Sequence, residues 1–210
     1  MTKNALIWGA DGGIGQGLTR HLLENGWQVV TVGRHTERLE GLGGLVIEAE
    51  ISDPFSVQTA VTAISQEVVD VDLWAYAIGD ITAAPVSQMA FNDWRRILDA
   101  NLNGAFLATQ YSLPLLAQEA HLFYLGAISE RMRLPGLSAY AAAKAGIEAF
   151  AEVVRKETRK RVSVVRPAAV DTPLWVKSPF KLPAHHLSPQ DVATRILQAY
   201  QAGEKGNLDL

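Results

Sequence analysis

Short runs of β-branched and other apolar residues alternate with longer helix-compatible segments along most of the chain. The spacing and capping residues of the longer segments predict helices over residues 14–25, 56–68, 92–117, 138–159 and 189–202. The apolar runs predict seven strands, over residues 5–8, 29–33, 45–49, 73–77, 122–126, 162–166 and 208–210. This alternation is typical of βα units, so we expect an α/β fold: a doubly wound parallel sheet with helices on both faces, in three α/β/α layers. The expected strand order is 3-2-1-4-5-6-7.

The composition limits the number of domains and the classes of partner. A length of 210 residues predicts a single domain over 1–210, and 48% hydrophobic with 20% charged residues is close to the globular average. The chain has a net charge of -3 and no lysine-rich or arginine-rich block, so we expect no nucleic-acid partner. It has no cysteine, which excludes disulfides, thiolate metal sites and a cysteine nucleophile and fits a reducing compartment.

Neither a secretion signal nor a membrane span is expected. The apolar stretch 5–8 is too short for the apolar region of a signal peptide. The uncharged stretch 100–118 contains asparagine, glutamine, threonine, serine and proline, which make it too polar to cross a membrane. We therefore expect a cytoplasmic protein without a membrane anchor.

A glycine-rich loop joins the first strand to the first helix. Such a strand-turn-helix arrangement directs backbone N–H groups and the positive end of the helix at one point, which suits a pyrophosphate. We expect Gly9 to permit a tight turn, Gly13 to let the phosphates approach, and Gly15 to allow close contact between helix and strand. The alternative is a turn that merely needs a positive φ. The candidate cofactor contacts in this loop are Gly9, Asp11, Gly12, Gly13, Ile14 and Gly15.

The end of the second strand predicts which dinucleotide is bound. An acidic residue there holds the ribose 2′-hydroxyl of NAD, whereas a basic residue accepts the 2′-phosphate of NADP. Gly33 stands where the acid would be, and Arg34 follows it, with His35 and Arg38 nearby. Arg34 can offer a bidentate, permanently charged fork to a phosphate. We therefore expect NADP(H) in preference to NAD(H); the alternative is that Arg34 is a solvated surface residue.

Tyr140 and Lys144 follow the fifth predicted strand and are four residues apart, so they share one face of a helix. Together with the glycine loop, this pair resembles the short-chain dehydrogenase/reductase family, and the resemblance covers nearly the whole chain. It implies that Tyr140 is the general acid/base. A neighbouring ammonium favours the phenolate, so Lys144 should lower the pKa of Tyr140. The resemblance also implies that Lys144 binds the nicotinamide ribose and that Asn101, on the inward face of its predicted helix, belongs to a proton relay.

The resemblance assigns further cofactor contacts to loops that follow predicted strands. Glu50 and Ile51, after the third strand, match a site at which the family contacts adenine. The fourth strand ends in residues 76–79, where the family usually carries two asparagines, alanine and glycine, so only the glycine is kept. Residues 166–172 resemble a proline-containing loop beside the nicotinamide. The remaining candidate cofactor contacts are therefore Glu50, Ile51, Ile78, Gly79, Pro167, Val170 and Thr172.

The chain departs from the family at the serine that polarises the substrate carbonyl. The family places this serine thirteen residues before the tyrosine, and here that position is Ala127. Alanine cannot donate a hydrogen bond, and loss of such a donor typically costs about 10²–10³ in turnover. Ser129 could take the role if its loop is shaped differently; the alternative is a solvent-facing loop serine. Ser138 is expected to be the N-cap of the helix that carries Tyr140.

Three further features concern partners and substrate. The alanine-rich helix from Ser138 and the helix from Asn92 offer surfaces for helix packing, and the resemblance implies a homodimer or homotetramer built on them. The apolar, proline-rich segment 173–189 has the length of a substrate lid and favours an apolar or aromatic small molecule; the alternative is a structural flap. His185 and His186 lack spaced partner ligands, so no metal is expected.

The resulting prediction is an NADP(H)-dependent oxidoreductase that interconverts a carbonyl and an alcohol by hydride transfer, with Tyr140, Lys144 and Asn101 as its catalytic residues. The alternative is a dinucleotide-binding sensor or scaffold that keeps the fold and has lost catalytic competence with the serine. A methyltransferase on a related fold is disfavoured, because its ribose-binding acid at the end of the second strand is also missing.

Overall fold

A computed structural model describes residues 2–128, 132–178 and 180–210. Its centre is one parallel sheet in the order β3-β2-β1-β4-β5-β6-β7, as expected from the alternation of apolar runs. All neighbouring strands pair in parallel, with Leu6 opposite Val30 on one side and Trp74 on the other. The strands are β1 (Asn4–Trp8), β2 (Gln28–Gly33), β3 (Leu45–Glu48), β4 (Val71–Tyr76), β5 (Leu116–Leu125), β6 (Arg161–Arg166) and β7 (Gly206–Asp209).

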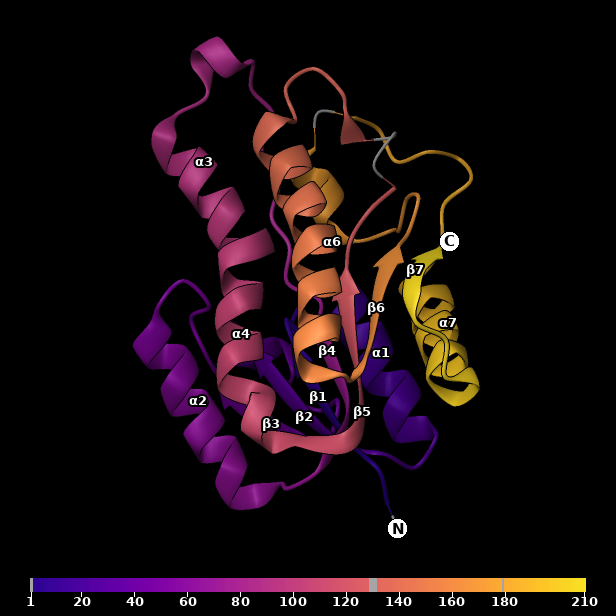
Figure 1. The fold of residues 1–210 in the computed structure, drawn as a ribbon. Coiled ribbons are helices and arrows are strands. Elements are labelled where there is room, and N and C mark those ends of the chain that lie inside the picture. Colours follow the sequence, from indigo (N-terminus) through magenta and orange to yellow (C-terminus); the bar gives the residue numbers. More distant parts are fainter. Residues whose placement is uncertain (1, 129–131, 179) are drawn as a thin grey trace.

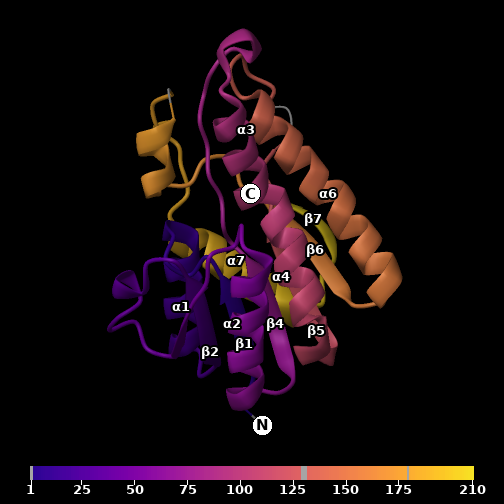
Figure 2. The ribbon, with the colours of Figure 1, turned by 90° about the vertical axis from the view of Figure 1, so that its left-hand side faces the viewer.

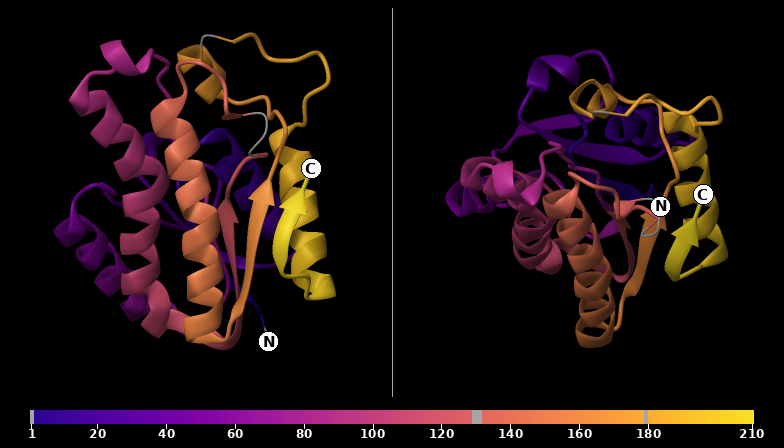
Figure 3. Two further views of the ribbon diagram at one scale, coloured as in Figure 1. Left: turned by 45° about the horizontal axis from the view of Figure 1, so that its top comes forward. Right: turned by 90° about the horizontal axis from the view of Figure 1, so that it is seen from above.

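Helices cover both faces of this sheet (Figure 1). One layer contains α2 (Pro54–Glu67), α3 (Phe91–Leu98), α4 (Gly104–Ser112) and α6 (Ser138–Thr158), and the other contains α1 (Gly13–Glu24) and α7 (Pro189–Ala202). A π-helical turn, Asp99–Asn103, joins α3 to α4. Seen from above, α6 and α7 lie on opposite sides of β6 and β7 (Figure 3). The result is the expected three-layer α/β/α arrangement.

Each face of the sheet has its own hydrophobic core, and the alternation of side chains along a strand explains why. In β1, Leu6 and Trp8 point into the core beneath α2, α4 and α6, whereas Ala5 and Ile7 point into the core beneath α1 and α7. All four are completely buried. A strand with both faces buried has a continuous run of apolar residues, and this run predicts the strand from the sequence.

The predicted helix 92–117 is wrong at its carboxyl end. Helix α4 ends at Ser112, the residues Leu113–Leu115 form a 3-10 turn, and Ala117 already belongs to β5. Pro114 lies in this turn, and because proline has no backbone N–H it cannot continue the helical hydrogen-bond ladder. Strand β5 is accordingly longer than the predicted segment 122–126.

The carboxyl ends of the strands meet at the upper edge of the sheet in Figure 1, where the loops after β1, β2, β4, β5 and β6 converge. In doubly wound sheets, ligands bind at this edge, where the strand order reverses. Figure 2 shows that α3 and α6 extend beyond the edge on one side, while the short helical turn Pro173–Lys177 extends on the other. Among the described residues, no helix has the length and apolar character required to cross a membrane.

Candidate active site

A cleft of about 1490 Å³ runs along this edge of the sheet. Its lining comes from the loops after β1 to β6, from α3 and the turn that follows it, and from the start of α6. Of the predicted cofactor contacts and catalytic residues that the structure describes, only Gly15 and Asn101 are not among those that line it. Residues separated by more than 150 positions in the chain, such as Gly9 and Thr172, therefore share one cavity wall.

Backbone conformation and close packing leave no room for a side chain at three positions of the glycine loop. Gly9 has φ +82°, which favours glycine. A Cβ at Gly15 would lie 2.1 Å from the carbonyl oxygen of Gly9. A Cβ at Gly13 would lie 2.8 Å from Cγ2 of Thr172, so in this structure Gly13 is required by contact with the loop after β6. Helix α1 begins at Gly13, so the positive end of the helix lies at the wall of the cleft.

Charges of both signs lie at the end of β2. The Asp11 carboxylate accepts a hydrogen bond from the backbone N–H of His35 at 3.2 Å, and a Cβ at Gly33 would lie 2.6 Å from Asp11 Oδ1. Arg34 forms an ion pair of 3.5 Å with Glu50, and 61% of the surface of its side chain is exposed. The space opened by the missing side chain at position 33 is thus partly filled by a carboxylate from the glycine loop, which sequence reasoning did not reveal.

Tyr140 and Lys144 lie one turn apart on α6 and both line the cleft. Lys144 is buried, and its Nζ donates a 2.7 Å hydrogen bond to the carbonyl oxygen of Leu125 at the end of β5. Its Nζ lies 5.6 Å from the centre of the Tyr140 ring. In this arrangement burial raises the pKa of Tyr140 to about 12, and burial lowers the pKa of Lys144 to about 8. The expected lowering of the Tyr140 pKa is therefore not found, because desolvation of the phenolate dominates.

Asn101 is fully buried in the π-helical turn between α3 and α4. Its amide donates to the carbonyl oxygens of Ile97 and Asp80, at 2.9 Å and 2.7 Å. Its own oxygen has no hydrogen-bond partner in the structure, and a Cβ at Gly79 would lie 3.3 Å from it. The side chain thus connects this turn to the loop after β4.

Tyr76 supplies support where the family usually has an asparagine. It is the last residue of β4, and its hydroxyl donates a 2.6 Å hydrogen bond to the carbonyl oxygen of Ala100. This bond ties β4 directly to the residue before Asn101. The departure from the family pattern at residues 76–79 is therefore accompanied by a different link between the strand and the π-helical turn.

Ala127 lines the cleft after β5, in the position that the resemblance assigns to the serine. Ser129, the alternative donor, lies outside the described residues. The prediction that Ser138 caps α6 is wrong: Leu137 is the N-cap, Ser138 is already the first helical residue, and its hydroxyl is buried without a hydrogen-bond partner. Since helix dihedrals begin at residue 138, its side chain is not placed to accept from the next turn in the way an N-cap does.

Sequence reasoning missed a set of ion pairs across the cleft. Asp80, just after β4, is contacted on one carboxylate oxygen by Arg96 of α3 and on the other by Lys177, at 2.8 Å. Lys177 lies 97 residues further along the chain, in the turn after β6. No local pattern indicates this pairing, because it depends on the folded arrangement of two loops.

The described part of the segment 173–189 runs beside the cleft and is attached to its wall. The indole N–H of Trp175 donates a 2.7 Å hydrogen bond to the carbonyl oxygen of Val170. Leu174, Phe180 and Pro183 of the segment line the cleft. At the far end, Nδ1 of His186 lies 2.8 Å from the carbonyl oxygen of Pro183. No group of three or more His, Asp or Glu side chains in ranges 2–128, 132–178 and 180–210 is arranged to hold a metal ion.

The sequence matches a family of known proteins over most of its length. A family model described as short chain dehydrogenase matches residues 3–181. Serine 3-dehydrogenase of Agrobacterium fabrum is 28% identical over 183 residues, which are 82% of this chain and 74% of that protein. An uncharacterized oxidoreductase of Staphylococcus epidermidis is 24% identical over 208 residues, covering 94% of this chain and 90% of the relative.

Solved structures share the fold. An alcohol dehydrogenase from the archaeon Thermococcus sibiricus, complexed with 5-hydroxy-NADP, has a TM-score of 0.90 at 22% identity, with 100% of this chain and 96% of that chain covered. A 3-ketoacyl-(acyl-carrier-protein) reductase from Brucella melitensis, complexed with NADH, has a TM-score of 0.88 at 23% identity, with 99% and 96% covered.

Proposed function

The chain belongs to the short-chain dehydrogenase family, and from this premise we propose that it is an NADP(H)-dependent oxidoreductase that interconverts a carbonyl and an alcohol. The observation that carries the proposal is that Tyr140 and Lys144 line the same cleft as the glycine loop. When bound, the nicotinamide supplies or accepts the hydride. Gly13 and Ile14, the first residues of α1, would hold the pyrophosphate through backbone N–H groups. Gly9 and Gly12 would shape the loop, since their own N–H groups donate to the carbonyl oxygens of Val32 and Gly9.

In this proposal Tyr140 moves the proton. Its phenol keeps its proton at neutral pH, because burial raises its pKa to about 12. It can therefore donate that proton to a carbonyl oxygen that gains negative charge during reduction. Lys144 would hold the nicotinamide ribose, and Asn101 would belong to a relay that returns a proton from solvent to Tyr140. The remaining cofactor contacts, proposed from the resemblance and from their place in the cleft wall, are Glu50, Ile51, Ile78, Gly79, Pro167, Val170 and Thr172.

The test is consumption of NADPH in the presence of a panel of aldehydes, ketones and quinones. We expect turnover of at least one apolar member of this panel. The competing proposal is a dinucleotide-binding sensor, which Ala127 favours because the cleft lacks the family's donor at that position. Binding of NADPH without turnover of any panel member would support the sensor.

The preference for NADP(H) is proposed from Arg34. We expect Arg34→Ala to raise the Kd for NADPH by about 10- to 100-fold, the range typical of lost hydrogen bonds to charged groups, and to change the Kd for NADH little. Titration calorimetry with both nucleotides measures the difference. Asp11→Asn is the matched variant and should have the opposite effect. Removing this carboxylate should lower the Kd for NADPH, because a 2′-phosphate would lie near it. Equal losses for both nucleotides in Arg34→Ala would contradict the proposed role.

An apolar or aromatic carbonyl substrate is proposed from apolar side chains that line the same cleft as Tyr140. They come from the loop after β4, from the region before α6 and from the segment after β6. The side chains concerned are Ile81, Met132, Leu134, Leu137, Leu174 and Phe180. Such a lining binds apolar groups and leaves orientation to a few polar ones.

A homodimer is proposed through α4 and α6. Within one chain, α6 packs on the π-helical turn, and a Cβ at Gly146 would lie 2.9 Å from Leu102, so part of the small-residue surface is used internally. Phe106 and Val153 remain 47% and 50% exposed. We expect light scattering at micromolar concentration to give at least twice the chain mass of 22.8 kDa. The double variant Phe106→Glu/Val153→Glu should give the monomer mass, and a monomeric wild type would contradict the interface.

A further inference from the structure

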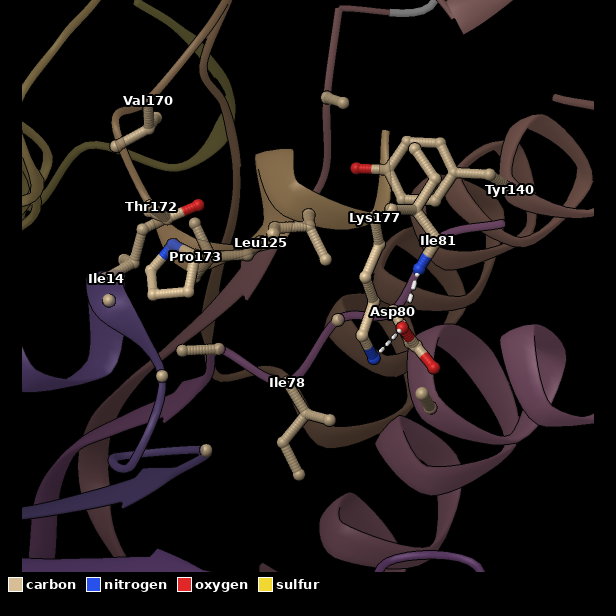
Figure 4. A pocket seen from close by; sticks show the side chains of 18 of the residues that line it. Ile14, Ile78, Asp80, Ile81, Leu125, Tyr140, Val170, Thr172, Pro173 and Lys177 are labelled. Atoms are coloured by element: carbon tan, nitrogen blue, oxygen red, sulfur yellow. Dashed lines mark hydrogen bonds and ion pairs between the residues drawn. The ribbon is translucent and has the colours of Figure 1, made fainter. Parts of the chain in front are cut away.

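We propose that Lys177 is a phosphate-binding residue that pairs with Asp80 in this structure and exchanges that carboxylate for the pyrophosphate of the bound dinucleotide. The inference rests on the proposed dinucleotide cofactor and adds a side-chain cation to its binding site. In Figure 4, Lys177 extends from the turn after β6 into the cleft and meets Asp80. The hydroxyl of Tyr140 points into the same open space.

The glycine loop creates the need for such a cation. Between Gly9 and Gly15 the only charged residue is Asp11, which is acidic. A pyrophosphate at this loop would therefore meet backbone N–H groups and the end of α1, but no basic side chain from the loop itself. A pyrophosphate carries negative charge on both phosphoryl groups, and a lysine ammonium binds phosphate well as a point charge.

Lys177 has neighbours toward both proposed ends of the cofactor. Asp80, its partner, follows Gly79, and a Cβ at Gly79 would lie 4.0 Å from Nζ of Lys144, at the proposed nicotinamide-ribose end. Arg34, at the proposed adenosine end, is close enough to influence Lys177 electrostatically. Because the pyrophosphate connects these two ends of a dinucleotide, we assign Lys177 to it.

The segment that carries Lys177 is already attached to the glycine loop. Thr172 and Pro173, directly before and at the start of the turn, pack on Gly13, and Trp175 is hydrogen-bonded to Val170. Lys177 is the last residue of this turn. Because 54% of the surface of its side chain is exposed, Lys177 has room to change rotamer.

The exchange leaves no unpaired carboxylate. Asp80 is only 13% exposed, so losing every cationic partner would be costly, but Arg96 contacts its second oxygen and remains after Lys177 departs. Lys177 itself is in an environment that favours an anion. Partial burial, together with the nearby guanidinium groups of Arg96 and Arg34, lowers its pKa. An arriving phosphate would offset that repulsion.

The test compares ligands with and without a pyrophosphate. We expect Lys177→Gln to raise the Kd for 2′-phospho-ADP-ribose by about tenfold or more and to change the Kd for 2′-AMP less than about twofold, both measured by calorimetry. Lys177→Arg should restore most of the affinity. Lys181→Gln, a lysine of the same segment that also lines the cleft, is the matched control and should bind both ligands like wild type.

The outcomes separate this inference from the proposed function. If the wild type binds neither ligand nor NADPH, the proposed cofactor is wrong. If the wild type binds and Lys177→Gln binds 2′-phospho-ADP-ribose equally well, the role of Lys177 is overturned while the cofactor stands. Equal weakening of both ligands would also overturn it, because a general structural effect does not distinguish a pyrophosphate from a 2′-phosphate.

Discussion

Tyr140→Phe is expected to lower turnover of a carbonyl substrate by about 10²–10⁴, the usual contribution of a positioned general acid. The phenylalanine ring occupies the same place on α6, so the shape of the cleft is kept and only the proton donor is lost. Because the proposed contacts to the nucleotide come largely from the glycine loop and Lys144, the Kd for NADPH should change little. Steady-state kinetics and a nucleotide titration on the same preparation measure the two effects.

Tyr124→Phe is the matched control. Tyr124 is buried in the core, and its hydroxyl lies 2.8 Å from the hydroxyl of Thr109 without lining the cleft. Removing this hydroxyl should lower stability modestly and leave turnover near that of the wild type. A Tyr140→Phe variant with unchanged turnover would remove Tyr140 from the mechanism and favour the sensor proposal.

The strands could be predicted because their signal is local, and their order followed from the topology rules of doubly wound sheets. Each strand of a doubly wound sheet buries both faces, so Ala5, Leu6, Ile7 and Trp8 form an uninterrupted apolar run although they belong to two different cores. The helix ends were less visible. The π-helical turn at Asp99–Asn103 keeps the apolar spacing of an α-helix, so the sequence predicts one continuous helix over 92–117.

The glycine loop and the Tyr140–Lys144 spacing are also local patterns, and most of the residues in them line one cleft. What they could not reveal are contacts between distant loops. Asp11 lies against Gly33 because the loop after β1 folds over the end of β2, and Lys177 reaches Asp80 across the cleft. In the proposed complex both contacts would place charge near a phosphate, and neither has a signature within a short window of sequence.

The pKa of Tyr140 shows a second limit of sequence reasoning. Spacing along a helix places Lys144 on the same face as Tyr140. The effect on the pKa of the phenol, however, depends on where the ammonium points and on how far burial shields the site from water. Here the ammonium donates to the Leu125 carbonyl oxygen, and burial raises the pKa of the phenol. Proximity in sequence alone predicts the opposite sign.

Ala127→Ser is expected to raise turnover of a small carbonyl substrate by about 10²–10³, the typical value of one preorganised donor to a developing oxyanion. Ala127 lines the cleft and is half-buried, so a hydroxyl added there faces the cavity that Tyr140 also lines. The gain should appear in kcat, because the donor interacts more strongly with the transition state than with the ground-state carbonyl. Ala127→Cys has nearly the same size but is a weak donor, and it should remain close to the wild type.

The turnover of the variants should change differently if Ser129 already supplies this hydrogen bond. Ser129→Ala should then cut turnover by about 10² or more with the NADPH Kd nearly unchanged, and Ala127→Ser should add little. The two variants therefore distinguish a site that lacks its donor from one in which the donor has moved by two residues. If neither variant changes turnover, a serine hydroxyl is not what activates the carbonyl here. The proton transfer assigned to Tyr140 would stand, but the charge on the substrate oxygen would have to be stabilised by another group.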